Sequence, residues 1–154
     1  MYCGVDVGST NIKVLFLDDE GQNLWVKSVP SPRRHDGHGV VTEGLELVAA
    51  LEDLIIEGWR AVGKGKPIAA IATTGIGEDG LCVAPDFTPR GLAIPWFDHR
   101  DRAEAGILKA SEEGRAHTQI NFGFSTAAAK WLWLRKHRPD AVRGNDPWVP
   151  LTDY

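Results

Sequence analysis

GVDVGSTNIKVLFLDDEG, residues 4–21, places a short polar turn between two apolar runs. The runs cover residues 2–7 and 11–18, and their apolar side chains recur with the alternation that is typical of β-strands. The turn between them is rich in small and hydrogen-bonding residues. The stretch therefore predicts a β-hairpin, whose turn either only connects the strands or also holds a charged ligand.

The turn has the chemistry of a phosphate cradle. Gly8 lets a ligand approach the main chain, and successive N–H groups in such a turn form an anion-binding concavity. Side-chain donors follow at Ser9, Thr10 and Asn11. Lys13 adds a point charge. These residues are therefore candidates for contacts with the phosphates of a nucleotide.

Asp6 ends the first apolar run and faces the same space. A carboxylate beside a phosphate cradle suits a Mg²⁺ ion between the two, because hard cations take oxygen ligands. Asp6 is therefore a candidate Mg²⁺ ligand, directly or through water. Gly, Ser, Thr and Asn are also ordinary turn residues, so the turn alone leaves the plain hairpin open.

The order of elements after the hairpin indicates an α/β fold. Strands expected at 22–29 and 68–74 enclose a loop and a helix over about 41–62, which gives an opening β-β-β-α-β. Apolar residues on both faces of 11–18 and throughout 68–74 predict strands covered on both sides. This order is typical of a ribonuclease-H-like domain, with a mixed sheet and helices on both faces.

The long predicted helix has one apolar face, with Thr42 before Glu43 and Glu46 at its start. The residues of that face step by three and four: Val41, Leu45, Val48, Leu51, Ile55, Trp59 and Val62.

Further along the chain, 80–84 and 91–96 are expected to be short strands, and helices are expected at about 99–113 and 125–138. The helical spacing of Trp59, Trp131 and Trp133 favours core or interface positions.

Composition excludes several classes of protein. The 154 residues, 43% hydrophobic and 25% charged, fit one globular domain. A net charge of -4 with scattered basic residues disfavours nucleic acid as the main partner. Neither a signal peptide nor an apolar run of about 20 residues occurs, so we expect a cytoplasmic protein without a membrane contact. Cys3 and Cys82 are expected to be buried free thiols, and His35 and His38 lack partners at metal-ligand spacing.

Four segments resemble the FGGY carbohydrate kinases, a branch of the actin/hexokinase/Hsp70 ATPase superfamily that includes xylulose, gluconate, glycerol and fucose kinases. The hairpin is similar to the first phosphate motif of the superfamily. AIATTGIGEDGLCVAPD (70–86) is similar to the strand and loop that carry polar side chains to the sugar. GLAIPWFDHRD (91–101) is similar to an I-x-W-x-D-x-R segment, and FSTAAAKWLWLRKHRPDAV (124–142) to a helix with a K-W-x-x-x-x-x-P pattern. Order and spacing match over nearly the whole chain.

The resemblance implies a protein of two domains with ATP and a sugar or polyol in the cleft between them. It implies phosphoryl transfer from Mg-ATP to a carbohydrate hydroxyl. It also supports the phosphate and Mg²⁺ roles of the turn residues named above. Glu78 matches a substrate-binding Glu of the glycerol-type kinases, but Gly75-Ile76-Gly77 stand where relatives often carry larger polar side chains, which disfavours glycerol.

The other substrate-side candidates have two interpretations each. Glu78 and Asp79 form either a sugar clamp or a solvated turn. Trp96 is expected to line the cleft. Asp98 and Arg100 either organise the substrate loop or belong to a helix N-terminus, with Asp98 as its cap.

The resemblance also implies that essential parts lie outside residues 1–154. The general-base Asp and the adenosine-binding half of the family lie beyond Tyr154. We therefore expect residues 1–154 to be the N-terminal portion of the N-terminal domain, without the C-terminal domain and without turnover. The apolar segment DPWVPLTDY at the end of the chain indicates truncation.

Two other functions stay open. One is a non-catalytic phosphate- or sugar-binding module. The other is a different enzyme of the superfamily, such as an acetate-kinase-like protein, which the W-x-D-x-R and K-W segments disfavour. A homodimer of the full-length protein is also left open, and the sugar is not identified.

Overall fold

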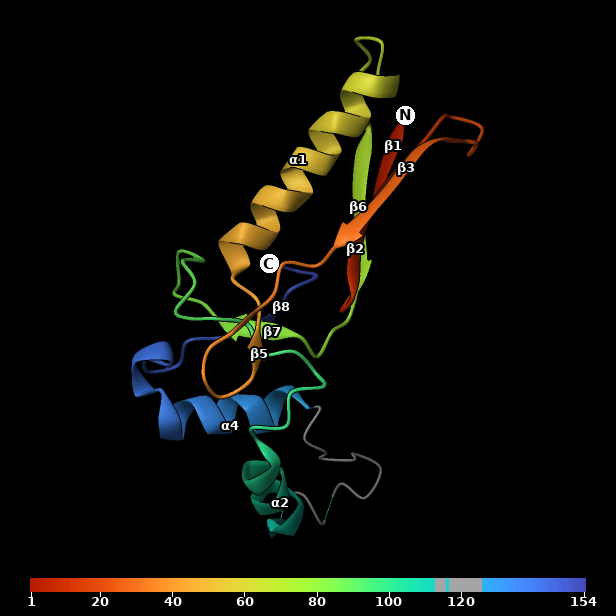
Figure 1. Ribbon diagram of the computed structural model, residues 1–154. Coiled ribbons are helices and arrows are strands. Elements are labelled where there is room, and N and C mark those ends of the chain that lie inside the picture. The colour runs from red at the N-terminus through yellow and green to blue at the C-terminus, as the bar shows by residue number, and fades with distance from the viewer. Residues whose placement is uncertain (113–115, 117–125) are drawn as a thin grey trace.

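The computed structural model describes residues 1–112, 116 and 126–154. Its centre is a four-stranded sheet in the order β3-β2-β1-β6 (Figure 1). β1 pairs antiparallel with β2, β2 pairs antiparallel with β3, and β1 runs parallel to β6. The predicted mixed sheet and the opening β-β-β-α-β are thus confirmed. The strands are β1 (Tyr2–Val7), β2 (Asn11–Leu17), β3 (Asn23–Pro30) and β6 (Ala70–Gly75).

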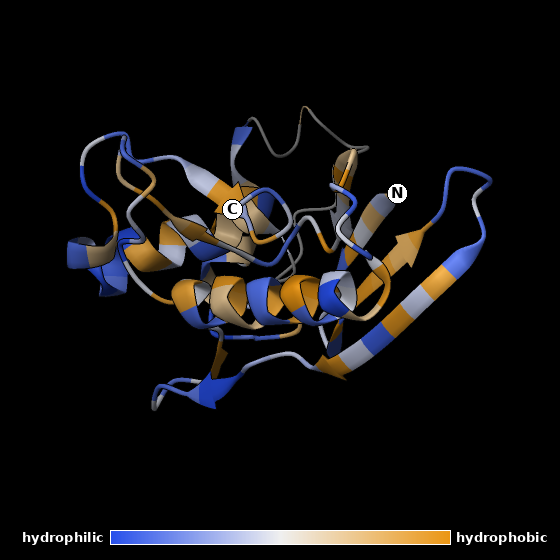
Figure 2. Cartoon of the chain, turned by 90° about the horizontal axis from the view of Figure 1, so that it is seen from above, coloured by the Kyte–Doolittle hydropathy of each residue, from blue (hydrophilic) through white to orange (hydrophobic). Residues whose placement is uncertain are grey.

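Helix α1 (Gly44–Val62) packs against one face of this sheet, over β2 and β3 (Figure 1). Its turns carry both hydrophobic and hydrophilic residues, as expected of an amphipathic helix (Figure 2). Leu47 and Leu54 of α1 pack against the sheet residues. Side chains alternate along a strand, so the sheet contributes every second residue. These residues are Cys3, Val5, Val7, Ile12, Val14 and Phe16.

Gly58 lets α1 approach the sheet closely. A Cβ atom at Gly58 would lie 2.5 Å from Cε2 of Phe16 and 2.7 Å from the ring of Trp25. The two rings meet edge to face, with centroids 6.1 Å apart. A larger residue would therefore have to push the helix away from this pair.

The start of α1 was predicted too early. Glu43 is the N-cap, and its carboxylate accepts a 2.9 Å hydrogen bond from the N–H of Glu46. Val41 belongs to a short strand, β5 (Val40–Val41), which pairs with β4 (Arg34–His35). Thr42 exchanges main-chain hydrogen bonds with Ala93. The chain is therefore extended up to residue 42.

The buried face of the helix also differs from the predicted one. Leu45 and Trp59, predicted to lie on that face, are 57% and 38% exposed. The buried stripe instead passes through Leu47, Leu54 and Gly58. Leu47, Leu51, Leu54 and Gly58 are also spaced by three and four, and this series is the one that faces the sheet, although Ile55 and Val62 of the predicted series are partly buried.

The sheet is covered less than predicted. β6 is exposed along its whole length, with Ile71 53% exposed, so the prediction of a strand buried on both faces is wrong for the described residues. β6 is the edge of the sheet and lies beyond the strands that α1 contacts. On the face of the sheet opposite α1, Leu15 is half-buried and Val26 is exposed.

A second cluster of elements lies beyond the end of the sheet where the β1–β2 turn is found (Figure 1). Its apolar core includes Cys82, Ile94, Trp133 and Leu134, which confirms the core position predicted for Trp133. The ends of the predicted helices at 113 and 125 lie outside the described residues. The elements are β7 (Gly80–Cys82), α2 (Arg102–Ala110), α4 (Ala127–His137), the 3₁₀ helix η1 (Pro139–Ala141) and β8 (Trp148–Pro150), which pairs antiparallel with β7.

Residues 91–96 do not form the predicted strand. Ala93 and Ile94 make isolated bridges to two different segments, at Thr42 and at Gly80. Pro95 follows and has no N–H to continue a ladder. The segment therefore joins its neighbours without forming a regular strand.

Two further expectations can be compared with the described residues. Cys3 and Cys82 are buried and not disulfide-bonded, as predicted. None of the helices in the described part of the chain has the length and apolar character that crossing a membrane requires.

Candidate functional site

The turn between β1 and β2 presents consecutive main-chain donors. Within the described residues, the N–H groups of Gly8, Ser9 and Thr10 donate to no protein group. Ser31 donates hydrogen bonds to the carbonyls of the turn. Its N–H donates to the oxygen of Thr10 at 3.0 Å. The Ser31 hydroxyl donates to the oxygen of Gly8 at 2.7 Å. A run of unpaired N–H groups is available to donate hydrogen bonds to an anion.

Gly8 is required in this turn by close packing. A Cβ atom at Gly8 would lie 2.5 Å from the carbonyl oxygen of Asn11. The φ angle of Gly8 is outside the left-handed region. The turn is therefore closed to larger residues by the approach of the main chain to itself.

Asp6 and Lys13 are register partners across β1 and β2. The Lys13 Nζ lies 3.7 Å from Oδ2 of Asp6, and both side chains are nearly half exposed. Asp6 alternates with the buried Val5 and Val7, so its carboxylate lies on the face of the sheet opposite α1.

An accessible carboxylate beside free N–H groups fits Mg²⁺. The ion commonly binds one or two carboxylates and takes its other ligands from water and phosphate oxygens. No cluster of three or more His, Cys, Asp or Glu that could hold a metal occurs within residues 1–112, 116 and 126–154. Asp6 would therefore hold the ion together with phosphate oxygens.

Asp79 is buried in the loop between β6 and β7. Its Oδ1 accepts a 2.6 Å hydrogen bond from the N–H of Trp96, and its main-chain oxygen accepts one of 2.8 Å from Leu151. Its Oδ2 lies 3.7 Å from Nη2 of Arg33. Burial raises the pKa of Asp79, against the opposing effects of the Trp96 N–H, Arg33 and Lys130. The hydrogen bonds of Asp79 therefore hold the β6–β7 loop against the segments that contain Trp96 and Leu151.

Glu78, the neighbouring residue, is exposed. Its Oε2 accepts a 2.6 Å hydrogen bond from the N–H of Ala127, the first residue of α4. A carboxylate at this position also interacts favourably with the positive end of the helix dipole. Glu78 thus joins the β6–β7 loop to α4 while part of its side chain stays accessible to solvent.

Trp96 carries an exposed ring above this loop. Its side chain is 41% exposed, and its ring meets that of Phe97 edge to face with centroids 5.8 Å apart. The Cζ atom of Arg33 lies 4.6 Å from the centre of the Phe97 ring. An exposed aromatic ring beside hydrogen-bonding groups is compatible with the predicted position in a substrate cleft.

Asp98 and Arg100 lie in a buried ion-pair network. Oδ1 of Asp98 accepts hydrogen bonds from Nε of Arg100 at 2.8 Å and from its N–H at 3.0 Å. Oδ2 of Asp98 accepts from the N–H of Val40 at 2.9 Å. Asp98 does not cap a helix as predicted, because α2 begins at Arg102 with Asp101 as its N-cap residue.

Asp36 completes this network from the β4–β5 turn. It accepts a 2.8 Å hydrogen bond from Nη1 of Arg100 and bonds of 3.0 Å from the N–H groups of His38 and Gly39. Burial would raise the pKa of Asp36, but the hydrogen bonds from Arg100, His38 and Gly39 outweigh it and lower the pKa to about 2. The network fastens the β4–β5 turn to the segment that follows Trp96.

Lys130 and Asp101 form a second buried pair. The Nζ of Lys130 lies 3.7 Å from Oδ2 of Asp101, and both side chains are fully buried. Burial raises the pKa of Asp101 to about 6, although Lys130 opposes the shift. Burial also lowers the pKa of Lys130, against the attraction of the carboxylates of Asp101, Glu78 and Asp79. Lys130 thus interacts electrostatically with Asp79 of the β6–β7 loop as well as with Asp101.

The β1–β2 turn and the β6–β7 loop lie together. Gly8, Arg33 and Asp79 line one small cavity of about 10 Å³, at the lower limit for a single water molecule. The structure therefore brings Gly8 close to Asp79, which in turn bonds the N–H of Trp96, whereas Asp98 and Arg100 lie in the buried network. Arg33 was not singled out from the sequence, because no periodic pattern marks a single cation in a Pro-, Gly- and charge-rich loop.

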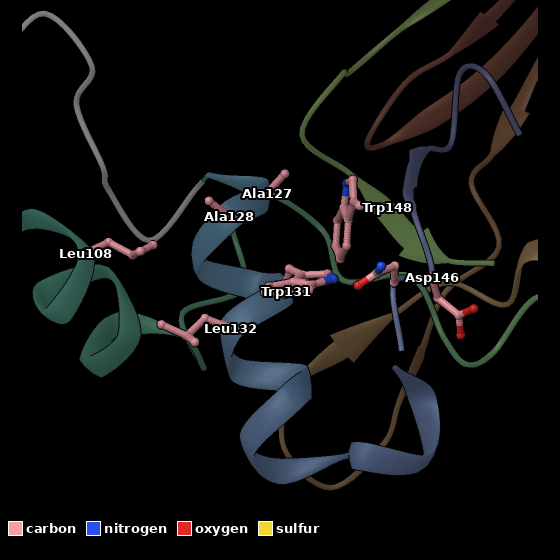
Figure 3. A pocket seen from close by; sticks show the side chains of 8 residues that line it. Leu108, Ala127, Ala128, Trp131, Leu132, Asp146 and Trp148 are labelled. Carbon is pink, nitrogen blue, oxygen red and sulfur yellow. The ribbon is translucent and has the colours of Figure 1, made fainter. Parts of the chain in front are cut away.

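A larger cavity of about 540 Å³ lies between α2, α4 and the segment before β8 (Figure 3). The rings of Trp131 and Trp148 and the side chain of Leu108 give it a mainly apolar wall (Figure 3). The carboxylate of Asp146, on its border, is engaged by Arg90 and by the N–H of Arg143. An apolar wall does not suit a phosphate, so the β1–β2 turn is the better phosphate site.

Comparisons with known proteins agree with this description. The profile of the FGGY family of carbohydrate kinases, N-terminal domain, matches residues 1–154. An erythritol kinase of Brucella abortus is 31% identical over 118 residues, which are 73% of this chain and 22% of that kinase. The chain thus spans about a fifth of the length of this curated relative.

Solved structures show the same fold at low sequence identity. A xylulose kinase from Brucella ovis has a TM-score of 0.86 at 20% identity, covering 99% of this chain and 33% of that protein. A glycerol kinase from Plasmodium falciparum, solved with ADP, has a TM-score of 0.78 at 22% identity, covering 92% and 30%. These likenesses confirm the predicted ribonuclease-H-like, actin-like ATPase fold. With its profile matched from the first residue to the last, the chain belongs to the FGGY family of carbohydrate kinases.

Proposed function

We propose that this chain supplies the phosphate turn and the acceptor loop of an ATP-dependent kinase that phosphorylates a hydroxyl group of a sugar or polyol. The phosphate turn is residues 8–10, and the acceptor loop is residues 76–79. The proposal rests on the N–H groups of Gly8, Ser9 and Thr10. Within the described residues, none of them donates a hydrogen bond to a protein group. Such a run beside an accessible carboxylate suits the phosphates of Mg-ATP.

Mg-ATP, when bound, supplies the phosphoryl group and the divalent charge that neutralises its oxygens. The N–H groups of Gly8, Ser9 and Thr10 donate to phosphate oxygens, with the Asn11 side chain as a further donor. Asp6 holds the metal ion, and Lys13 adds positive charge on the same side. The contribution of these residues is to position the phosphates and to stabilise their charge.

On the acceptor side, Glu78 and Trp96 offer a carboxylate and an aromatic ring to a hydroxylated substrate. Asp79 holds the main chain of Trp96 in place, and the Asp36–Arg100–Asp98 network holds the segment behind it. A Cβ atom at Gly77 would meet nothing within 4 Å, so the loop leaves room beside Glu78. The erythritol kinase relative makes a polyol the first acceptor to test.

We further propose that residues 1–154 form the N-terminal portion of the N-terminal domain of a longer kinase. The general base that takes the proton of the acceptor hydroxyl, and the groups that bind adenosine, are then provided by the remaining chain. On this proposal, residues 1–154 alone bind phosphate groups without turnover.

The test is an ADP-release assay on the full-length protein that carries residues 1–154. Erythritol, xylulose, glycerol and gluconate are offered separately with Mg-ATP, and a sample without acceptor measures background hydrolysis. We expect ADP release that depends on a polyol or sugar, with glycerol a poor acceptor. Absence of acceptor-dependent ADP release in a folded protein that binds Mg-ATP would contradict the kinase and favour the non-catalytic binding module.

A further inference from the structure

Arg33 is a largely buried cation whose donors are hardly used. Its side chain is 19% exposed, and its Nε is buried without a hydrogen-bond partner among the described residues. The nearest carboxylate oxygen, Oδ2 of Asp79, lies 3.7 Å from Nη2, which is longer than a hydrogen bond. A guanidinium group has five N–H donors, and buried donors are normally satisfied. Arg33 is therefore suited to an acceptor that the protein itself does not provide.

The side chain is held in place although its donors are not satisfied. Its Cζ lies 4.6 Å from the centre of the Phe97 ring, within the range of a cation–π contact. Burial lowers the pKa of Arg33, and the nearby carboxylate of Asp79 opposes that shift. The group is thus oriented before any ligand arrives.

The position of Arg33 connects the two halves of the proposed site. Ser31, two residues earlier, holds the phosphate turn through the carbonyls of Gly8 and Thr10. The Arg33 side chain lines the same small cavity as Gly8 and Asp79. Asp79 in turn holds the N–H of Trp96 on the acceptor side. The guanidinium therefore lies beside Asp79 of the acceptor loop, and Arg33 lines a cavity together with Gly8 of the phosphate turn.

We propose that Arg33 donates hydrogen bonds to the phosphoryl group at this junction and stabilises its negative charge during transfer. The inference rests on the proposed kinase function. The planar guanidinium can donate two parallel hydrogen bonds to phosphoryl oxygens, whereas an ammonium group acts as a point charge. In the transfer, the bond between the γ-phosphorus and the bridging oxygen of ADP breaks, and a bond from that phosphorus to the acceptor oxygen forms. The hydroxyl proton goes to the general base, and Arg33 keeps its own protons throughout.

The kinetic test uses the full-length protein with Arg33→Met, Arg33→Lys and the matched control Arg34→Met. Arg34 is half exposed and pairs with Glu46 at 3.6 Å on the surface. Removing a group that stabilises transition-state charge typically costs about 10²–10³-fold in kcat. We expect that loss for Arg33→Met with the acceptor KM little changed, a partial recovery for Arg33→Lys, and wild-type kinetics for Arg34→Met. A raised acceptor KM with unchanged kcat would overturn the proposal, because it would mark Arg33 as a positioning residue only.

A binding test on the wild-type protein needs neither turnover nor a substituted chain. The Nε–H resonance of Arg33 is followed by NMR while inorganic phosphate is added in the presence of MgADP. We expect this resonance to move downfield on saturation, as for a new hydrogen bond to an oxyanion. An unchanged Arg33 resonance while phosphate shifts the amides of the phosphate turn would overturn the contact. If the wild-type protein shows no kinase activity, the proposed function fails, and this titration still decides whether Arg33 contacts phosphate.

Discussion

The hydroxyl group of Ser31 donates a 2.7 Å hydrogen bond to the carbonyl oxygen of Gly8. The N–H of the same residue donates to the carbonyl of Thr10 at 3.0 Å. Ser31, the residue after β3, thereby bonds the carbonyl groups of the β1–β2 turn, and the N–H groups of that turn remain available for another partner. This contact connects strand pairing in the sheet to the proposed binding of phosphate.

Replacing Ser31 by Ala should weaken nucleotide binding. The loss of a hydrogen bond of this kind costs about 1 kcal/mol, or about fivefold in affinity if the whole loss falls on the bound turn. Ser28→Ala is the matched control, since the Ser28 hydroxyl donates at 3.3 Å to the carbonyl of Ile12, a residue of β2 and not of the turn. Calorimetric titration with MgADP should show weaker binding for Ser31→Ala only. Equal affinities of the two variants would contradict the anchoring role.

Gly58→Ala should destabilise the fold. The added methyl group would lie 2.5 Å from Phe16 and 2.7 Å from Trp25, and overpacking of a core typically costs about 1–3 kcal/mol. Gly106→Ala in α2 is the control, because a Cβ atom there meets nothing within 4 Å. Replacing a glycine by alanine at such an open helical position should raise the free energy of unfolding by about 0.5–1 kcal/mol. Urea unfolding measures the free energy of unfolding of both variants. A Gly58→Ala variant more stable than the wild type would show that α1 does not pack as described.

The network around Asp36 should make stability depend on acidic pH. The folded-state pKa of about 2 lies below the unfolded value of about 3.9, so the stabilisation is complete above the unfolded pKa and is lost as pH falls through the folded pKa. The gap between the two pKa values corresponds to about 2–3 kcal/mol of stability. Asp36→Asn should therefore be less stable than the wild type at pH 5, and the difference should shrink towards pH 2. A difference that stays constant across this range would argue against an ionised Asp36 in the network.

The buried pair of Lys130 and Asp101 should show strong coupling. Removing one partner leaves the other charge buried, which costs about 3–5 kcal/mol. We expect Lys130→Met and Asp101→Leu to be destabilised in this way, and the double variant to lose much less than the sum of the two. A double-mutant cycle by chemical unfolding measures the interaction. Additive losses would show that the two side chains do not act as a pair.

The sequence predicted the parts of the fold that depend on local pattern. Alternation along 2–7 and 11–18 located β1 and β2, and the spacing of three and four located the long helix, because these periods follow from backbone geometry alone. The predicted buried face was wrong because two series of residues in this helix have the same spacing, and the one through Leu47, Leu54 and Gly58 faces the sheet. The two main-chain bridges of 91–96 come from segments distant in sequence, so its apolar character was mistaken for a strand.

The candidate site was predicted in part for the same reason. Gly8, Ser9 and Thr10 lie within one short motif, so their resemblance to a phosphate motif was visible in the sequence. The contacts that tie the site together span long separations, such as Arg33 to Asp79 and Asp36 to Arg100. Such pairs have no local signal, and only the folded chain shows that Asp98 and Arg100 are buried with each other.

The most direct test of the phosphate turn is a titration of the ¹⁵N-labelled full-length protein with MgADP, followed at its main-chain amides. The control is the turn between β2 and β3, where the N–H groups of Glu20 and Gly21 already donate to Asp18 at 3.1 and 3.2 Å. We predict downfield shifts for the amides of residues 8–10 on saturation and unchanged amides at Glu20 and Gly21. Binding of MgADP without shifts at residues 8–10, or with equal shifts in both turns, would contradict the assignment of this turn to the phosphates.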